Sequence, residues 1–308
     1  MSKLIVWCVQ PKCHHYSTSY RNIKAISNIL NVPFVEDKLS LGVARAMTDC
    51  EYPDIIFGGW VVLPWIKWRD EYMDLMQKSE RTIWLREEYG PEWKIDNRLF
   101  DVLADEVWTS VKYMVEEQVE TNYYYYDWGK FALAPYYRRR WTPEKRGIIY
   151  FGQLRQERME YFERYMHPNK YDVSIAAKKK ERENWLAFDS RIHTFQETEP
   201  TRFNVFEGSI YIENPWMHEH DCSISRRFYE IVHTGLPCFI DRNSLPTFDR
   251  YRIPILKGWI VNDAGDLYHG LLNASRIQHG QQQLWDTDVW YAEAEADFLQ
   301  LCRERSVI

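Results

Sequence analysis

The sequence predicts an α/β protein of two domains, each built around a parallel sheet. Short apolar segments typical of buried strands alternate with segments typical of helices, and this alternation favours a parallel sheet. The chain has 308 residues, which suits two domains of about 150 residues each. Its content of 45% hydrophobic and 27% charged residues is typical of a globular protein and not of a disordered one.

The first predicted domain covers residues 1–141. Its predicted strands are residues 3–9, 33–35, 54–59, 82–85 and 106–109, and its predicted helices are 22–30, 70–78 and 111–120. Residues 137–145 break this pattern with a run of arginines and a proline, so we expect them to connect the two domains. A tyrosine cluster at 123–126 is local and does not form a repeat.

The second predicted domain covers residues 146–285. Its predicted strands are 147–151, 171–176, 210–212, 238–240 and 258–261, and helices are predicted at 159–165, 223–234 and 263–272. A last helix is predicted at 290–303. No run of about 18 apolar residues occurs, so we expect no membrane span.

The most informative segment is SISRRFYEIVHTGLPCFID, residues 223–241, which predicts a helix, a glycine stop and a buried strand. Ser223 or Ser225 can cap the start of the helix. Gly235 suits the left-handed position that ends a helix, and Pro237 cannot continue one.

Two charged residues of this helix predict a nucleotide site. Arg227 and Glu230 are three apart, so they share one face near the positive end of the helix dipole. The arginine and the backbone N–H groups can hold phosphate oxygens, and the carboxylate can accept two hydrogen bonds from a ribose diol. The alternative is an ordinary amphipathic helix that carries a surface ion pair.

A second motif, IIYFGQLRQER at residues 148–158, places a glycine and two arginines after a strand. Gly152 lets the backbone approach a ligand closely. Arg155 and Arg158 follow the end of a strand, where α/β sheets bind their ligands. Surface salt bridges with Glu157 and Glu160 are the alternative.

These two motifs resemble the donor-site segments of the GT-B glycosyltransferases, and more narrowly of the DNA β-glucosyltransferase family of T-even phages. The resemblance implies a GT-B fold, with two Rossmann-like domains facing across a cleft. It also implies that the C-terminal helix, about 290–308, packs back on the first domain. In this family the arginines matching Arg155, Arg158 and Arg227 bind the UDP diphosphate, and the acid matching Glu230 binds the ribose. One residue fewer separates Arg155 from Arg158 here than in the family.

The resemblance also implies a catalytic base in the first domain. The family carries an Asp three residues after a strand leucine, and counting from Leu85 places Glu88 there. An inverting transfer needs one base to take the proton of the acceptor hydroxyl. The rivals for this role are Glu87 and His15. The non-catalytic alternative is that Glu87 and Glu88 are two solvated surface glutamates.

The chain shows no complete metal-ligand set. Cys8, Cys13, His14 and His15 do not complete a tetrahedral zinc site, so no metal ligand is predicted. His218 and His220 precede the donor helix, where they are candidates for contact with the sugar or the diphosphate, or for a plain polar loop. Mg²⁺ or Mn²⁺ is compatible with the sequence but not required by it, and no tightly bound cofactor is expected.

Charge is distributed unevenly and bears on the acceptor. The net charge is −6, yet residues 138–182 hold 13 Lys and Arg against 6 Asp and Glu, a local charge of +7. A basic region can steer a polyanion, whereas a solvated helical face is the alternative for residues 178–180. The overall acidic charge argues against DNA, because phosphate contacts supply most of the non-specific affinity.

The resemblance therefore predicts an inverting glycosyltransferase that moves a sugar from a UDP-sugar, UDP-glucose or UDP-arabinose, to 5-hydroxymethylcytosine in double-stranded phage DNA. Such an enzyme flips the base out of the stack. The alternatives are a GT-B enzyme that acts on a surface glycan, lipid precursor or small metabolite, and a nucleotide-sugar-binding protein without activity. Six cysteines without a disulfide pattern predict the cytoplasm, and we expect a monomer.

Overall fold

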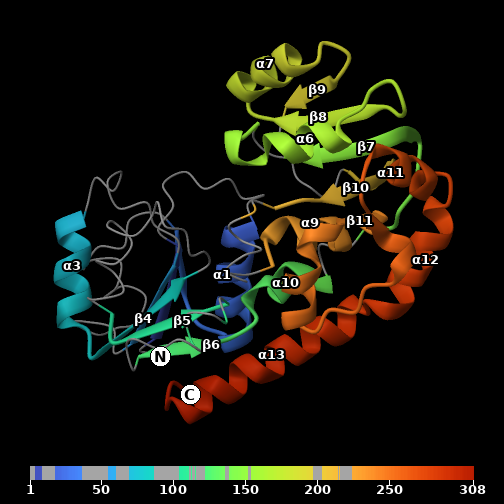
Figure 1. Ribbon diagram of the computed structural model, residues 1–308. Helices are drawn as coiled ribbons and strands as arrows, with labels where there is room; N and C mark the ends of the chain where they lie inside the picture. Colours follow the sequence, from blue (N-terminus) through green and yellow to red (C-terminus); the bar gives the residue numbers. More distant parts are fainter. Residues whose placement is uncertain are drawn as a thin grey trace. The chain divides into compact units, whose positions relative to one another are not determined.

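A computed structural model of the protein describes residues 4–8, 18–36, 55–59, 69–86, 104–110, 112, 115, 122–135, 139–151, 154–196, 203–213, 215 and 224–308. The chain divides into two compact units. The first consists of Met1–Phe131 together with Ala292–Ile308, and the second is Ala132–Tyr291. Each unit is organised around its own sheet, and the two sheets are drawn in Figure 1.

The first unit holds a parallel sheet of six strands in the order β2-β1-β3-β4-β5-β6. Its strands are β1 (Leu4–Cys8), β2 (Phe34–Glu36), β3 (Ile55–Gly59), β4 (Arg81–Arg86), β5 (Glu106–Thr109) and β6 (Tyr123–Tyr125). Its helices are α1 (Thr18–Leu30) and α3 (Arg69–Lys78), and the 3-10 helix η3 (Trp128–Leu133) runs into the second unit. The five strands predicted in this region are confirmed, and the tyrosine cluster forms the sixth. Of the helix predicted at 111–120, only residues 112 and 115 are described, and both are helical.

The second unit also holds six parallel strands, in the order β12-β11-β10-β7-β8-β9. Its strands are β7 (Lys145–Phe151), β8 (Val173–Ala177), β9 (His193–Gln196), β10 (Phe206–Tyr211), β11 (Cys238–Asp241) and β12 (Ile260–Val261). Its helices are α6 (Met159–Tyr165), α7 (Lys179–Phe188), α9 (Arg226–His233), α10 (Leu245–Arg250), α11 (Ala264–Leu271) and α12 (Ala274–Leu284). Short 3-10 helices occur at η5 (Gln156–Arg158), η7 (Arg242–Ser244) and η8 (Lys257–Trp259).

The strand order of the second unit is that of a Rossmann sheet. Its first and fourth strands, β7 and β10, lie side by side, and the chain proceeds outward from them in both directions. Such a reversal is the topological switch point at which open α/β sheets bind ligands, beyond the carboxyl ends of the strands. Any ligand of this unit is therefore expected next to the residues that follow Phe151 and Tyr211.

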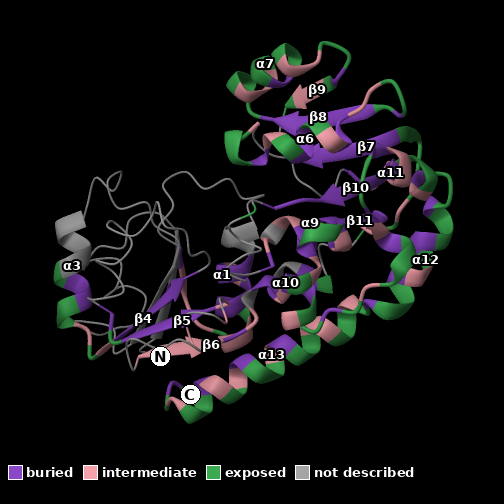
Figure 2. Ribbon diagram, in the orientation of Figure 1, coloured by how far each residue is buried: buried purple, intermediate pink, exposed green. Residues whose placement is uncertain are grey.

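The central strands of the second unit are buried, as Figure 2 shows by their colour, whereas the edge strand β9 has no buried residue. Every residue of β8 and β11 is buried, and so are the last five residues of β7. A parallel sheet covered by helices requires such continuous apolar strands. This is why short apolar runs without alternation predicted the other five strands, whereas β9, which has no buried residue, was not predicted.

Helix α9 begins and ends where its sequence predicts. Ser225 occupies the N-cap position with an extended backbone, although its side chain makes no capping hydrogen bond. Gly235 follows with a φ of 72° and donates its N–H to the Val232 carbonyl at 3.0 Å. The left-handed backbone costs glycine little, so the chain can turn directly from α9 into β11.

One predicted strand is shorter than expected. Of residues 258–261, only Ile260 and Val261 form a strand, because Lys257–Trp259 is a 3-10 helix. Trp259 is 3% exposed and packs on Trp285, with ring centroids 4.8 Å apart. The apolar character that predicted a strand here therefore reflects side-chain packing of a 3-10 turn.

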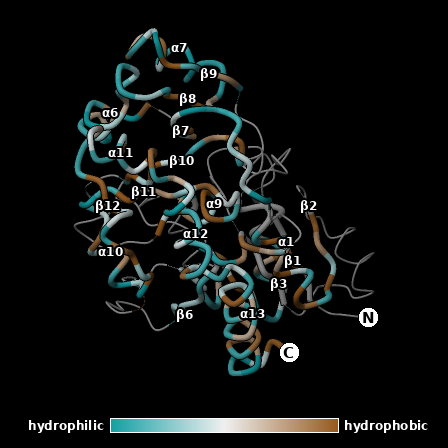
Figure 3. The backbone as a smooth tube through the Cα atoms, turned by 90° about the vertical axis from the view of Figure 1, so that its right-hand side faces the viewer, coloured by the Kyte–Doolittle hydropathy of each residue, from teal (hydrophilic) through white to brown (hydrophobic). Residues whose placement is uncertain are grey.

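The last helix, α13 (Thr287–Glu304), carries hydrophilic and hydrophobic residues along its length (Figure 3). From Ala292 onward its residues belong to the first unit. Phe298 is fully buried there and meets Trp108 and Phe131 edge to face, at centroid distances of 5.7 and 5.6 Å. Aromatic packing thus makes the end of the chain part of the first core. Among the described residues, none of the helices combines the length and the apolar content of a membrane-spanning segment.

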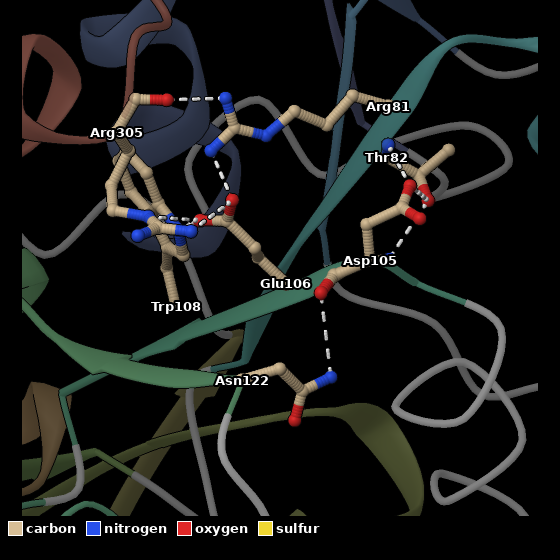
Figure 4. Close-up of polar contacts among 7 residues, drawn as sticks. All are labelled: Arg81, Thr82, Asp105, Glu106, Trp108, Asn122 and Arg305. Atoms are coloured by element: carbon tan, nitrogen blue, oxygen red, sulfur yellow. Dashed lines mark hydrogen bonds and ion pairs between the residues drawn. The ribbon is translucent and has the colours of Figure 1, made fainter.

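A buried carboxylate ties the C-terminal residues to the first sheet (Figure 4). Glu106, the first residue of β5, accepts hydrogen bonds from Arg305 at 3.1 and 3.2 Å, from Trp108 Nε1 at 2.9 Å and from Arg81 Nη2. Arg81 also donates to the Arg305 carbonyl. Burial opposes the charge of Glu106, but the hydrogen bonds from Arg305, Trp108 and Arg81 outweigh it and lower its pKa.

Candidate functional site

The candidate site lies at the switch point of the second sheet. The residues that gather there follow β7, follow β10 or begin α9, so three separate stretches of the chain contribute. The topology places them at the carboxyl ends of neighbouring strands, which is where Rossmann units bind nucleotides. The predicted donor residues Arg158, Arg227 and Glu230 come from two of these stretches.

At the centre of the site is Glu213, two residues beyond β10 and only 3% exposed. Its Oε2 lies 2.6 Å from Nη2 of Arg158, and its Oε1 lies 3.1 Å from Nη1 of Arg227. The side chains of these arginines are 9% and 14% exposed. One buried carboxylate therefore joins two of the three arginines that the resemblance assigns to the donor diphosphate.

Arg227, in the first turn of α9, is held by several groups. Its Nε donates to the Phe151 carbonyl at 3.1 Å, and its Nη1 donates to the Ile212 carbonyl at 3.2 Å as well as to Glu213. Its guanidinium carbon lies 4.9 Å from the centre of the Tyr150 ring. The strand ends of β7 and β10 thus fix the plane of the guanidinium. No described residue accepts a hydrogen bond from its Nη2.

Arg158 is buried more deeply. Its Nη2 donates to Glu213 and its Nη1 to the hydroxyl of Tyr150 at 3.4 Å. Burial works against its charge, but the opposite charge of Glu213 is strong enough that its pKa is raised. With both Nη atoms engaged and only 8% of the residue exposed, Arg158 acts as the counter-ion of Glu213.

The N-terminus of α9 completes the site with an unused hydroxyl. The backbone N–H of Ser225 donates to the Tyr211 hydroxyl at 3.0 Å, which fixes the start of the helix on β10. The Ser225 Oγ is buried and has no hydrogen-bond partner among the described residues. A helix N-terminus attracts anions, and here it carries a hydroxyl that is available to one.

The two remaining described candidates lie at the borders of this cluster. Glu230 is half-buried, one turn after Arg227 on the same face of α9. Arg155 is half exposed and its Nη1 lies 3.6 Å from Glu157, the contact expected of a surface pair. The structure therefore joins Arg158 and Arg227 through one carboxylate and leaves Arg155 with its neighbour in sequence.

Several predicted site residues fall outside the described residues. They are Gly152 of the second motif, Glu87, Glu88 and His15 of the first domain, and the loop residues His218 and His220. Their roles stay predictions.

Sequence reasoning missed Glu213. It is a single acidic residue after an apolar strand, and no motif spacing links it to its partners, which lie 55 and 14 residues away in the chain. The available signal was charge balance: arginines that follow or face the ends of buried strands require an acid nearby, because an unpaired buried charge is costly. An acidic residue directly after the neighbouring strand is the natural supplier.

The described residues hold no group of three or more His, Cys, Asp or Glu side chains that could bind a metal ion. The expectation that Mg²⁺ or Mn²⁺ is compatible with the protein but not required stays a prediction.

Comparison with known proteins gives matches in structure. No protein-family model matches the chain, and none of the curated proteins matches it. The structure of T4 phage BGT with UDP and Mn²⁺ matches with a TM-score of 0.65 at 12% identity, and the complex with its UDP-glucose substrate with 0.65 at 13%. The structure of the DNA modifying enzyme β-glucosyltransferase, with and without uridine diphosphoglucose, matches with 0.65 at 12%.

Each of these alignments covers 96% of this chain and 98% of the other. The likeness therefore extends over both units. It confirms the GT-B fold that the sequence predicts, and at this level of identity it shows the fold alone.

Proposed function

We propose that this protein is a UDP-sugar-dependent glycosyltransferase that modifies DNA. The observation that carries the proposal is the arginine cluster around Glu213, at the switch point of the second Rossmann sheet. The solved structures that share the fold over nearly the whole chain contain UDP or UDP-glucose, which supports the same class of donor here. UDP-glucose is the first donor to test, and UDP-arabinose the second.

In the proposed complex, the donor lies over the N-terminus of α9. Arg227 donates its Nη2 to a phosphate oxygen, and the Ser225 hydroxyl and the helix N-terminus donate to the same diphosphate. Arg155 adds a flexible positive charge from the segment after β7. Glu230 accepts hydrogen bonds from the ribose hydroxyls, one turn along the helix.

The arrangement suits the chemistry of the leaving group. When the anomeric carbon is transferred, the bond to the diphosphate breaks and negative charge accumulates on UDP. Hydrogen-bond donors that are already oriented toward the diphosphate stabilise this charge without reorganisation. This stabilisation is the largest contribution that such a site makes to the rate. The acceptor hydroxyl loses its proton to a general base as it attacks, and we assign this role to Glu88, with Glu87 and His15 as rivals. A single displacement inverts the anomeric centre.

For the acceptor we propose 5-hydroxymethylcytosine in double-stranded DNA. Its hydroxymethyl group carries the required hydroxyl, and the base must leave the stack to reach the donor carbon. The basic stretch 138–182 supports a polyanionic acceptor. The net charge of −6 favours a second candidate, a glycan or small metabolite acceptor.

One experiment separates these candidates. The protein is incubated with 5-hydroxymethylcytosine duplex DNA and a panel of UDP-sugars, and the nucleosides are analysed by mass spectrometry with unmodified DNA as control. A hexose or pentose mass shift on the modified nucleoside alone is the expected result. UDP binding without any mass shift would move the acceptor to glycans or metabolites, and absence of UDP binding would refute the donor site.

The assignment of the base is tested by Glu88→Gln. We expect unchanged UDP affinity, because the residue is assigned to the acceptor side, and a turnover lowered by about 10²- to 10⁴-fold, the usual worth of a general base. Isothermal titration and the nucleoside assay measure the two quantities. Full activity in this variant would transfer the role to Glu87 or His15.

A further inference from the structure

Glu213 has no role in the donor contacts assigned so far, yet it contacts two of the arginines in the site. We propose that Glu213 is a positioning residue for diphosphate recognition, which aims Arg227 at the donor while Arg158 balances its charge. This inference rests on the proposed function. It adds Glu213 to the residues that serve the diphosphate, although its own negative charge would repel a phosphate.

The first step is the count of hydrogen-bond donors. A guanidinium has five N–H groups in a rigid plane. In Arg227, acceptors at Phe151, Ile212 and Glu213 engage Nε and Nη1. Within the described part of the chain nothing engages Nη2, so this group remains available for a ligand. Because the fork is planar, fixing one side determines where the other side lies.

The second step is the charge. A buried arginine needs an opposite charge nearby, but a carboxylate that only neutralised Arg227 would leave no net positive charge to attract a diphosphate. With Arg158 bound to its other oxygen at 2.6 Å, the cluster of two arginines and one glutamate carries a net charge of +1. The site therefore gains an oriented arginine and still attracts an anion.

The third step is rigidity. Glu213 is 3% exposed, and its two oxygens contact different arginines from different segments of the chain. The neighbouring Tyr211 is fully buried and holds the backbone of Ser225, at the start of the same helix that carries Arg227. The end of β10 thus positions both groups that remain available, Arg227 Nη2 and Ser225 Oγ. A site oriented before binding does not lose affinity in ordering its side chains.

The test compares the affinities for UDP and for uridine, which lacks the diphosphate. The affinity for UDP divided by the affinity for uridine reports the contribution of the diphosphate. This ratio is insensitive to a general loss of folded protein. UDP is measured by isothermal titration and uridine by ligand-observed NMR, on wild type and on Glu213→Gln. We expect the ratio to fall about tenfold or more in the variant, because Arg227 loses its charged partner.

A second variant separates the orientation of Arg227 from the net charge of the cluster, and it guards against misfolding. Glu213→Gln leaves two buried arginines without a counter-ion, whereas Arg158→Met combined with Glu213→Gln restores the net charge of +1 with an apolar group in place of the second arginine. If orientation matters, the double variant also shows a reduced ratio. If only net charge matters, it keeps the wild-type ratio, and the inference is wrong.

A third variant, Glu213→Asp, keeps the charge but shortens the side chain by one methylene, so that it cannot reach both arginines as Glu213 does. We expect an intermediate ratio. A wild-type ratio in whichever of these variants folds would overturn the inference while the proposed function stands. Equal affinity of the wild type for UDP and uridine would instead refute the proposed donor site itself.

Discussion

Each unit of the protein contains a buried glutamate held between two arginines, and the two clusters lie at opposite ends of their sheets. In the first unit Glu106 and Arg81 are the first residues of β5 and β4, so the cluster lies at the amino ends of the strands. In the second unit Glu213 follows β10, so the cluster lies at the carboxyl ends. Ligands bind Rossmann sheets at the carboxyl ends of the strands. Of the two clusters, only the one around Glu213 therefore lies where a ligand is expected.

The clusters also differ in what their arginines contact. Arg81 donates to the Arg305 carbonyl as well as to Glu106, and Arg305 lies over the Tyr124 ring at 4.4 Å. This cluster joins the C-terminal residues to the sheet. In the second unit, Arg227 keeps one nitrogen without an acceptor among the described residues. We therefore interpret the first cluster as structural and the second as a ligand site.

The largest effect is expected from Glu106→Gln. It leaves Arg81 and Arg305 without their shared carboxylate. Breaking a fully buried ion pair costs about 3–5 kcal/mol, and the cost here is lower because solvent screens the Arg305 side chain, which is 36% exposed. We expect a clear fall in melting temperature and urea midpoint, with the affinity ratio of UDP to uridine unchanged. Circular dichroism melts measure the stability, and isothermal titration of UDP with ligand-observed NMR of uridine measures the affinity ratio. A loss of UDP preference with unchanged stability would remove the distinction between the clusters.

A smaller effect is expected from pH. The pKa of Glu106 is lowered from its ordinary value of 4.5, so the native state binds this proton less readily than the unfolded state does. The stabilisation is complete from about pH 5.5 upward, about one pH unit above this ordinary value, and is lost as the pH falls through the lowered pKa, by at most about 1.4 kcal/mol per pH unit for one proton.

Urea unfolding between pH 7 and pH 3.5 checks this expectation. The stability difference between wild type and Glu106→Gln should be constant from pH 7 to about 5.5 and shrink at lower pH. A difference that stays constant over the whole range would mean that the Glu106 carboxylate does not titrate differently on folding.

Much of the fold could be predicted because it depends on local patterns. Buried parallel strands are short apolar runs, and caps such as Gly235 act within one turn of the chain. Helices α7 and α12 were not predicted, because their sequences are mostly polar. They contribute only a few buried residues, such as Trp185 and Gln281, so the apolar signal that predicts a covering helix is weak.

The candidate site was predicted in part for the same reason. Arg227 and Glu230 are neighbours on one helix, so their spacing alone places them together. The link between Arg158 and Arg227 depends on Glu213 and on the adjacency of β7 and β10. Only the strand order brings these segments together, and no local pattern contains it.

The smallest effect is expected at the border of the donor site, where the comparison of Arg155 and Lys179 tests how far the site extends. Both residues are exposed and belong to the basic stretch 138–182, but Arg155 follows β7 at the switch point and Lys179 begins α7. We expect Arg155→Ala to weaken UDP binding by about twofold to fivefold, the range of an exposed charge pair. Lys179→Ala should leave UDP binding unchanged, because the strand order places α7 after β8, away from the switch point. Equal effects of the two variants in isothermal titration would mean that Arg155 contributes only to the general positive charge of this stretch and that diphosphate recognition ends at the cluster around Glu213.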